Sequence, residues 1–472
     1  MKKNLLKYIM ICGLVLTSAC TDDFLDVDSR EDVDAEHSED VYTPEMMVNG
    51  VYGMLTDWNY AFAWLGVTEI ISDNADKGSA PTDAGTDKLI LDNLEHTSTT
   101  PSIKSMWEHF YKTIGRASLA IQFTEEYGLT DESYKNRLIG EAKFLRAMHY
   151  FWLVRMFGDV PIQDIDDPES WTVRAPKSEV YTFIEQDLLD AINFLPNKSE
   201  YASNDLGRAT KGAAQGMLAK VYMYQEKWQE AYDMAGNVMN SGQYGLESDY
   251  ATVWRASTEN GIESLFEVQA RGEAEAHGVQ QYSETQGARG VGGWGWGFNT
   301  PSQNLLDTYN AEGDAIRRDA TIIFRGETLW DGRLVPDTVE NPMYNEKAYS
   351  SANAGAGDGD KNIRILRYAE ILLIRAEAAT YTGGDAATPL NMVRNRVGLA
   401  SIGNPSVEDI WKERRLELAF EHDRWFDLIR TGQAQSAMAA NGKNFVVGKH
   451  ELFPIPNDQL IQTPGMTQNP GW

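Results

Sequence analysis

The chain has almost no cysteine: of its 472 residues, only Cys12 and Cys20 are cysteines. Residues 21–472 can therefore form neither a disulfide framework nor a cysteine-rich metal site. A catalytic thiol is excluded from the same stretch.

Long hydrophobic runs are also missing. The run from Tyr8 to Ala19 has 12 residues, whereas a helix that crosses a bilayer needs about 20. Lys2, Lys3 and Lys7 precede this run and small residues end it, which is typical of a secretory signal peptide. We therefore expect residues 1–19 to be removed, and we expect no membrane-spanning helix in the mature chain.

Positive charge is scarce. The chain has 42 Lys and Arg against 70 Asp and Glu, for a net charge of −28. Without the signal peptide 39 basic residues remain and the net charge is −31. This charge disfavours nucleic acid and anionic membrane surfaces as partners. It does not identify a ligand, because solubility alone is a sufficient explanation.

Known catalytic motifs are lacking as well. We find no Gly-x-Ser-x-Gly, no phosphate-binding loop and no pair of histidines at metal-binding spacing. Asp358, Gly359 and Asp360 could join a calcium site, but the rest of an EF-hand loop is missing. We predict a protein without catalytic residues, metal or other cofactor, and keep calcium as the alternative.

One acidic cluster resembles a catalytic or metal site. Glu413, Glu417 and Glu421 lie four residues apart, followed by His422 and Asp423. Arginines are interleaved with them, and Arg424 can reach Glu421 and Asp427 on one helix face. We therefore predict structural ion pairs between stacked helices, and the same for Glu141, Arg146, Glu370 and Glu377.

The most informative segment is residues 140–162, GEAKFLRAMHYFWLVRMFGDVPI. Two apolar stripes run along it at helical spacing: Ala142, Leu145, His149, Trp152 and Met156, and beside them Phe144, Ala147, Phe151 and Val154. A helix with two apolar stripes packs against neighbours on two sides, as an inner helix of a stack does. Gly158 ends the helix, and Pro161 prevents its resumption.

Paired helices are predicted along most of the chain. Helical spacing covers residues 103–127, 132–157, 180–195, 210–225, 228–239, 365–381, 386–397 and 406–429. Within two of these helices, six residues match tetratricopeptide positions in type or size: Leu218, Ala219, Tyr222, Ala231, Ala235 and Val238. Such pairs stack into a curved solenoid. Residues 59–101 and 241–360 read as mostly irregular, with a short strand at 263–268, and residues 449–472 as an extended tail without helix.

Several blocks of the sequence resemble the SusD/RagB-like outer-membrane nutrient-binding lipoproteins of Bacteroidota. They are residues 140–162, Arg364–Ala378 (RILRYAEILLIRAEA), Asn391–Gly398, Glu413–Arg430 (ERRLELAFEHDRWFDLIR) and the closing LFPIP and QNPGW. The resemblance implies a mainly α fold: about four tetratricopeptide-like helix pairs in a right-handed solenoid, which supports an irregular region with few short strands. It also implies a SusC-like TonB-dependent transporter as partner.

The resemblance extends to the N-terminus. Leu16 to Cys20 (LTSAC) resembles a bacterial lipobox, with Thr17 where leucine is usual, and Thr21-Asp22-Asp23 resembles an acidic export tag. This implies acylation of Cys20, for example with palmitate, and an anchor in outer-membrane lipid on the extracellular side. The alternative is an ordinary signal cleaved at another position.

Together these features predict five segments. They are a lipoprotein signal peptide (1–19), a lipidated tether (20–42), an N-terminal half with helix pairs (43–240), a loop-rich ligand-binding region (241–362) and a C-terminal half with helix pairs and tail (363–472).

Glycan recognition needs exposed aromatic planes for the C–H faces of sugars and planar polar groups for their hydroxyls. In an extended chain, Trp294, Trp296 and Phe298 would point the same way, and the glycines between them leave the rings uncovered. Arg289, Asn299 and Gln303 supply polar groups nearby. The alternative is that these rings pin a glycine-rich loop to the body.

A second candidate is residues 58–83, a loop that often contributes to the ligand site in the family. Its candidate residues are Trp58, Tyr60, Trp64, Asn74, Asp76 and Asp83. Trp64 fits the core equally well, because Phe62, Leu65 and Val67 surround it. Trp330 and Tyr344 are weaker candidates, and Trp107, Trp152, Trp228 and Trp425 are expected to pack between helices.

The function predicted from the sequence is cell-surface binding of an oligo- or polysaccharide and its delivery to the transporter. One alternative is a peptide-uptake lipoprotein of the RagB type. A glycoside hydrolase is another, but it needs two carboxylates roughly 5–10 Å apart across a cleft, and the acidic clusters are interleaved with arginine.

The lipid anchor is directly testable. Cys20→Ala should release the protein from membrane fractions or block its maturation, because the acylated thiol is lost. Cys12→Ala is the matched control and should stay attached, since Cys12 is removed with the signal. Unchanged membrane attachment and acyl labelling of Cys20→Ala would refute the assignment.

Overall fold

The computed structural model describes residues 42–80, 82–83, 87–272, 278–351 and 359–472. The chain divides into two units, Met1–Thr43 and Pro44–Trp472. The predicted signal peptide, Cys20, nearly all of the tether and Asp358 lie outside the described residues. Within the described part, no helix has both the length and the apolar character needed to cross a membrane.

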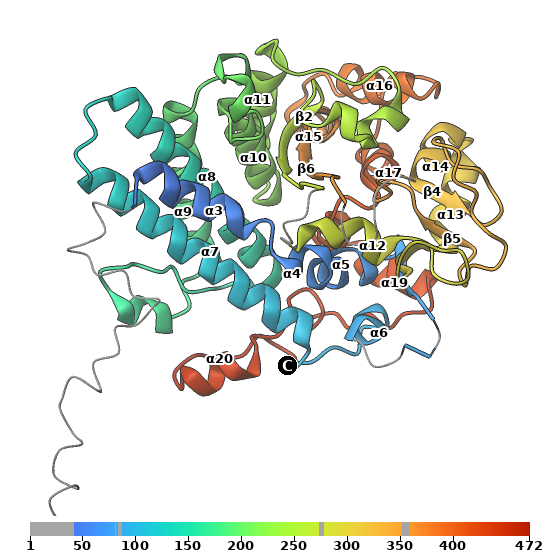
Figure 1. Ribbon diagram of the computed structural model, residues 1–472, viewed down its shortest axis with the longest axis horizontal. Coiled ribbons are helices and arrows are strands. Elements are labelled where there is room, and N and C mark those ends of the chain that lie inside the picture. Colours follow the sequence, from blue (N-terminus) through green and yellow to red (C-terminus); the bar gives the residue numbers. More distant parts are fainter. Residues whose placement is uncertain (1–41, 81, 84–86, 273–277, 352–358) are drawn as a thin grey trace, which may run out of the picture. The chain divides into compact units, whose positions relative to one another are not determined.

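Helices that follow one another along the chain pack side by side in the first half of the second unit (Figure 1). They are α3 (Pro44–Met54), α7 (Pro101–Glu126), α8 (Glu132–Phe157), α9 (Lys177–Phe194), α10 (Lys211–Tyr224) and α11 (Trp228–Asn240). Helix α8 contacts α7 and α9, and all residues of its two apolar stripes are buried. The predicted inner helix is confirmed, with its end at Gly158, whose φ of 71° an L side chain rarely adopts.

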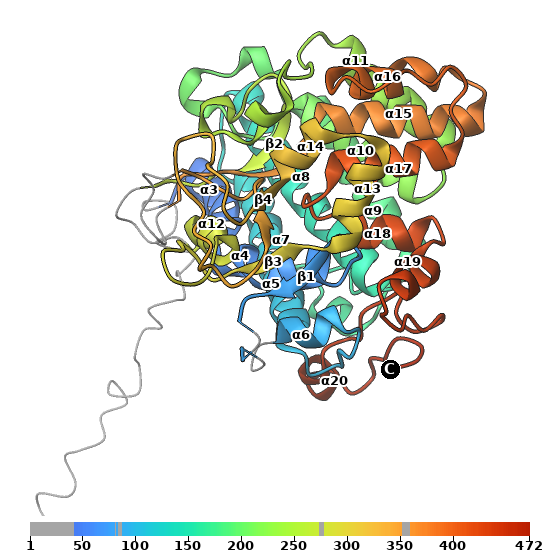
Figure 2. The same ribbon diagram turned by 90° about the vertical axis from the view of Figure 1, so that its right-hand side faces the viewer.

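The helix stack continues after a long irregular insertion. Helix α15 (Tyr368–Thr382) packs on α11, and α16 (Ala387–Arg396) and α17 (Val407–Leu418) pack on α15 (Figure 2). The six tetratricopeptide-like residues are all buried. The predicted mainly helical, tetratricopeptide-like class is therefore confirmed.

The irregular region contains short helices and three two-stranded antiparallel ladders. The ladders pair β1 (Ala75–Gly78) with β3 (Phe298–Pro301), β2 (Ser264–Val268) with β6 (Ile363–Arg367), and β4 (Ile322–Phe324) with β5 (Met343–Asn345). The short helices are α4 (Trp58–Ala61), α5 (Ala63–Leu65), α6 (Asp87–Asp92), α12 (Tyr282–Gln286), α13 (Gln303–Glu312) and α14 (Ala315–Thr321), with a π-helical turn η2 (Gly66–Ile70). Single 3₁₀ turns are Pro168–Thr172, Lys198–Glu200, Ser203–Asp205, Tyr250–Trp254, Ala256–Thr258 and Val279–Gln281 (η8).

Some predicted elements are wrong. Residues 59–101 carry four short helical elements and a strand rather than an irregular loop, and Ile365 to Arg367 belong to β6 rather than to a helix. The tail contains α20 (Asn457–Gln462), which begins directly after Pro456, because a proline ahead of a helix does not disturb it. Helix α19 (Ala434–Ala440) was not predicted.

The predicted helix 406–429 is broken in two. Helix α17 ends at Leu418 and α18 runs from Arg424 to Arg430, with Phe420 and His422 in the left-handed region between them. The break turns Arg424 away from Glu421, so its predicted pairing is wrong: it binds Asp73 at 2.7 Å. The helical periodicity of the sequence continues through residues 419–423, so this periodicity could not reveal the break.

Glu413 and Glu417 of α17, and Glu421 in the turn after it, form buried ion pairs, as predicted. The Glu417 carboxylate forms ion pairs with the guanidinium groups of Arg317, at 3.1 Å, and Arg367, at 2.6 Å, and also with that of Arg396. We call this set the Glu417 lattice; it further includes Glu413, Glu421 and Lys347. Burial alone would raise the pKa of Glu417, but the three arginines hold that pKa well below its usual range.

The lattice predicts a large loss of stability on removal of one charge. Glu417→Gln should lower the free energy of unfolding by about 3–5 kcal/mol, because three buried guanidinium groups lose their shared carboxylate. Glu312→Gln, which breaks the more exposed Lys412 pair, should cost at most about 1 kcal/mol. Chemical denaturation of both variants measures the difference; equal, small losses would contradict the role of the lattice.

Candidate functional site

Three half-buried aromatic rings come together where α4, α12 and the loop before β3 meet. The ring of Trp58 stacks on that of Phe62, with centroids 5.5 Å apart and planes 24° apart. Trp296 approaches both, at 5.6 Å from Trp58 and 6.1 Å from Phe62. We call these three residues the aromatic face.

The backbone around Trp58 is tightly packed. Asp57 caps α4 by accepting a hydrogen bond from the Asn59 amide at 2.8 Å. Gly278 lies against it with a φ of 88°, and a Cβ there would sit 2.4 Å from the Trp58 nitrogen. Only glycine fits this approach, which allows Val279 to donate its amide to the Thr56 carbonyl at 2.8 Å.

Trp296 is held by Glu284 of α12. Its amide donates to the Glu284 carbonyl at 2.8 Å, and its indole N–H donates to the Glu284 carboxylate at 3.2 Å. Gln281 donates to the other carboxylate oxygen at 3.3 Å. Beneath these rings, buried Phe298 contacts Phe62 edge-on at 5.1 Å. The ring position is therefore set before any ligand arrives.

The arrangement combines flat apolar rings with fixed polar groups. A sugar ring can stack its C–H face on such rings, while its hydroxyls hydrogen-bond to carboxylate and amide groups. Glu284 and Gln281 supply such groups next to the aromatic face. The chemistry is that of binding, since fixed side chains and aromatic planes lower the cost of ordering the site.

Trp294 lies in a different cluster. Its ring meets Tyr349 at 5.5 Å and the guanidinium of Arg333 at 4.8 Å, and Trp330 meets Tyr349 from another direction at 6.2 Å. The expectation that Trp294, Trp296 and Phe298 point the same way is wrong for Trp294. The segment is a pair of turns rather than a strand: the amides of Trp294 and Gly295 both donate to the Ala288 carbonyl.

Two candidates from distant segments form an ion pair. Arg289 contacts Asp83 at 2.6 Å and also donates to the Ser79 hydroxyl at 3.0 Å. Gly297, next to Trp296, lies against this pair, because a Cβ there would sit 2.9 Å from the Arg289 Cβ. The pair thus borders the loop that carries Trp296.

The structure buries several candidates. Tyr60, Trp64, Asn74, Phe298 and Asn299 are each at most 4% exposed. Their partners are internal: Tyr60 bonds His149, Asn74 accepts from Arg415, and Asn299 donates to Gln286. These residues support the site from below and offer no surface to a ligand. The weaker candidate Tyr344 is likewise fully buried, whereas Trp330 is 51% exposed.

Two candidates, Asp76 and Gln303, are exposed to solvent but do not contact the aromatic face. Asp76 is on β1, where burial of its carboxyl and then the nearby Asp92 raise its pKa to about 6, although the residue as a whole is solvent-exposed. Gln303 is on α13 and donates to Asp307 one turn later.

Phe62 and Glu284 are not among the residues predicted from the sequence. Phe62 also fits the surroundings of Trp64, but it lies four residues after Trp58, the spacing of neighbours on one helix face. No local pattern in the sequence points to Glu284, because its role depends on a contact with Trp296, which lies 12 residues later in the chain.

Other assignments agree with the structure. His149 is a satisfied core residue, hydrogen-bonded to Tyr60 at 2.9 Å and to the Leu145 carbonyl at 2.7 Å. Trp107, Trp152 and Trp425 are buried between helices, whereas Trp228 is only half-buried. Among the described residues, no group of three or more His, Cys, Asp or Glu could hold a metal ion. That the protein binds no metal stays a prediction.

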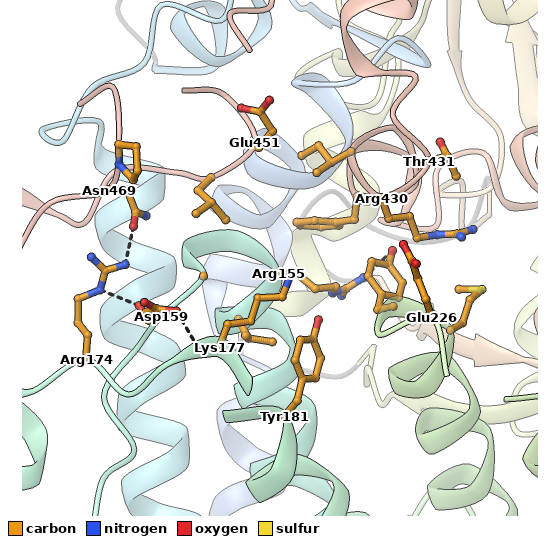
Figure 3. Close-up of a pocket in the computed structure, with 18 of the residues that line it drawn as sticks. Arg155, Asp159, Arg174, Lys177, Tyr181, Glu226, Arg430, Thr431, Glu451 and Asn469 are labelled. Atoms are coloured by element: carbon orange, nitrogen blue, oxygen red, sulfur yellow. Dashed lines mark hydrogen bonds between the residues drawn. The ribbon is translucent and has the colours of Figure 1, made fainter. Parts of the chain in front are cut away.

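A separate cavity of about 830 Å³ opens between helix ends and the C-terminal tail (Figure 3). Its walls come from the ends of α8, α10, α15 and α18, the starts of α9 and α11, the middle of α17, and the loop residues Asp159, Arg174, 451–452 and 467–470. It shares no residue with the aromatic face. No sequence pattern predicts this cavity.

Comparisons with known proteins cover most of the chain. Residues 262–472 match the SusD family, and residues 23–223 match a family described as starch-binding associating with outer membrane. SusD-like protein P2 of Formosa agariphila is 29% identical over 477 residues, which span 90% of this chain and 91% of that protein. The starch-binding protein SusD of Bacteroides thetaiotaomicron is 23% identical over 420 residues, or 73% of this chain and 74% of that protein.

Solved structures agree. A laminarin-binding SusD-like protein is 29% identical, with a TM-score of 0.79 over 91% of this chain and 99% of that chain. Surface glycan-binding protein A from Bacteroides thetaiotaomicron, in complex with laminarihexaose, has a TM-score of 0.77 over 90% of this chain and 98% of that chain. At 23% identity, the second likeness concerns the fold alone.

Proposed function

The chain belongs to the SusD family, and from this membership and its aromatic face we propose that it binds a neutral oligosaccharide at the cell surface. It then delivers the oligosaccharide to a SusC-like TonB-dependent transporter in the outer membrane. The observation that carries the proposal is the convergence of Trp58, Phe62 and Trp296, with Glu284 fixing the indole.

The relatives support this ligand class. A protein that is 29% identical over nearly its whole length is a laminarin-binding SusD-like protein, and another relative is a starch-binding protein. Laminarin and starch are uncharged glucose polymers, so their recognition relies on ring stacking and hydroxyl contacts. The aromatic face supplies both.

The place of action follows from the N-terminal residues. Acylation at Cys20 anchors the protein in the outer membrane with the ligand-binding unit on the extracellular side. Residues 20–42, predicted from the sequence to be a tether, link this anchor to the ligand-binding unit.

The chemistry of the acidic clusters favours binding over hydrolysis. Glu413, Glu417 and Glu421 are bound to arginines or Lys347 inside the protein. A glycosidase instead needs one carboxylic acid and one carboxylate facing each other across the ligand. We infer that the protein has no catalytic role and that bound glycan leaves it unchanged.

The aromatic face predicts a loss of affinity on removal of its rings. Trp58→Ala and Trp296→Ala should each weaken binding of the preferred oligosaccharide by roughly 5- to 30-fold, since one stacked ring contributes about 1–2 kcal/mol. Calorimetry with laminarihexaose, maltohexaose and cellohexaose measures the effect, and thermal melting checks the fold.

Two tryptophans provide matched controls for this experiment. Trp171 is 42% exposed in a distant 3₁₀ turn, so Trp171→Ala should bind like the wild type. Trp294→Ala reports whether the second aromatic cluster contributes. Wild-type affinity in Trp58→Ala, Trp296→Ala and their combination would place the site elsewhere.

If the protein only binds glycans, every bound oligosaccharide should stay intact. Prolonged incubation of pure protein with each member of the panel should release no shorter products, as measured by chromatography. Product formation that is abolished by Glu284→Gln would overturn the binding-only proposal and favour a hydrolase at the aromatic face.

A further inference from the structure

The cavity between the helix ends is built from fixed walls. Arg174 holds the tail in place by donating to the carbonyl of Thr467 at 2.9 Å and to the side chain of Asn469. Arg430 is fixed by Glu377 at 2.6 Å, and Trp411 donates to the same carboxylate at 2.9 Å. The volume of about 830 Å³ is within the range of small-ligand sites.

One hydroxyl group points into this cavity without a partner. Tyr181 is 3% exposed, and its hydroxyl is directed toward the open space (Figure 3). Within the described part of the chain, this hydroxyl makes no hydrogen bond. The Nε of Arg155 and one carboxylate oxygen of Glu451 also lack a partner, but both atoms are inaccessible. A hydroxyl that faces a cavity and lacks a partner can hydrogen-bond to a polar ligand.

The charges of the wall are balanced. The lining contains four basic and four acidic residues, in a chain whose net charge is −28. Two of the basic residues are already neutralised by ion pairs, Arg430 with Glu377 and Arg155 with Asp423. A strongly charged ligand would therefore meet an equal number of like charges, whereas an uncharged, hydrogen-bonding ligand would not.

Aromatic rings line one side of the cavity. Trp228 and Tyr381 stack in parallel, with centroids 4.1 Å apart and planes 10° apart, and Tyr381 is 48% exposed. Both residues line the cavity together with Trp411. Stacked rings at the edge of a polar cavity are suited to a ligand with one apolar face.

The walls do not match the common modes of peptide binding. The lining residues lie on helices, at helix ends, in the tail or, for Asp159 and Arg174, next to the single bridge between Val160 and Ala175. None of them belongs to a strand, so among the described residues the cavity offers no strand edge for an added strand. The lining mixes charged and apolar residues, whereas an amphipathic helix requires a continuous apolar groove. A ligand rich in hydroxyl groups satisfies the donors and acceptors of the wall equally well.

We propose that this cavity is a second saccharide site, which binds a short, neutral stretch of glycan separately from the aromatic face. The inference rests on the proposed function for its ligand class, but not on the aromatic face itself. Tyr181 and the exposed Lys177 would contact the hydroxyls, and the Trp228–Tyr381 pair would contact the C–H face of a sugar ring. Two separate sites on one chain would raise the avidity for a long polysaccharide.

The test observes the two sites separately. The full mature chain is labelled with 5-fluorotryptophan, and the ¹⁹F resonances of Trp58, Trp228, Trp296 and Trp171 are assigned from single Trp→Phe variants. Laminarihexaose, maltohexaose, cellohexaose and a mixture of short peptides are then added in turn. We expect the Trp228 resonance to shift with at least one hexasaccharide while Trp171 stays fixed.

Variants distinguish direct contact from an indirect effect. Tyr181→Phe removes only a hydroxyl without a partner, so the fold should persist while the Trp228 response needs about fivefold more saccharide, the effect of one lost hydrogen bond. The Trp228 response should remain in the Trp58→Ala/Trp296→Ala double variant.

Each other outcome counts against the inference. If saccharides shift Trp58 and Trp296 but not Trp228, the second site is wrong while the proposed function stands. If the Trp228 response disappears in the double variant, it originates at the aromatic face and the second site is again wrong. A response to peptides alone would make the cavity a peptide site, and no response of any tryptophan to the saccharides would overturn both proposals.

Discussion

The structure depends on the need to pair charges that are buried. Glu417 is fully buried on α17, and its carboxylate can stay ionised only because Arg317, Arg367 and Arg396 surround it. These arginines come from α14, β6 and α16, so one carboxylate connects the irregular region with two parts of the helix stack. Lys347 extends the connection by binding Glu421 at 2.8 Å and the Glu417 carbonyl at 3.0 Å. The loop-rich region is thus held against the stack by a few strong and directional contacts.

A second set of buried polar contacts leads from this lattice to the aromatic face. Just after Glu421, His422 accepts or donates two hydrogen bonds, with Thr68 at 2.8 Å and with Tyr282 at 3.0 Å. Its amide donates to Glu69, whose pKa is raised to about 8 by burial. Tyr282 begins α12, and Glu284 on the same helix orients Trp296. The break between Leu418 and Arg424 therefore places His422 where it can hydrogen-bond to Tyr282 and fix the position of α12.

Much of this molecule could be predicted from periodicity and from family resemblance. The bounds of α8, the burial of its two stripes and the ion pairing of the α17 glutamates follow from local spacing, because residues three or four apart share a helix face. At the candidate site, Trp296 was chosen from its residue type and its neighbouring glycines, and Trp58 from its residue type and the family resemblance of its loop. The structure brings the centroids of the two rings to 5.6 Å from each other. The grouping of Trp294 with Trp296 failed, since a glycine-rich segment has no fixed period and its turns are set by contacts with Ala288 and Glu284.

The sequence by itself determined the helical class, the order of the paired helices, the buried stripes and the resemblance to a family of surface binding proteins. These properties are encoded locally, in spacings of three to four residues and in short motifs. Only the tertiary structure decided which aromatic rings remain accessible, that Phe62 and Glu284 complete the aromatic face, and that helix ends and the tail enclose a separate cavity. The physical reason is that exposure and concavity arise from contacts between residues far apart in the chain, and those contacts leave no periodic trace in the sequence.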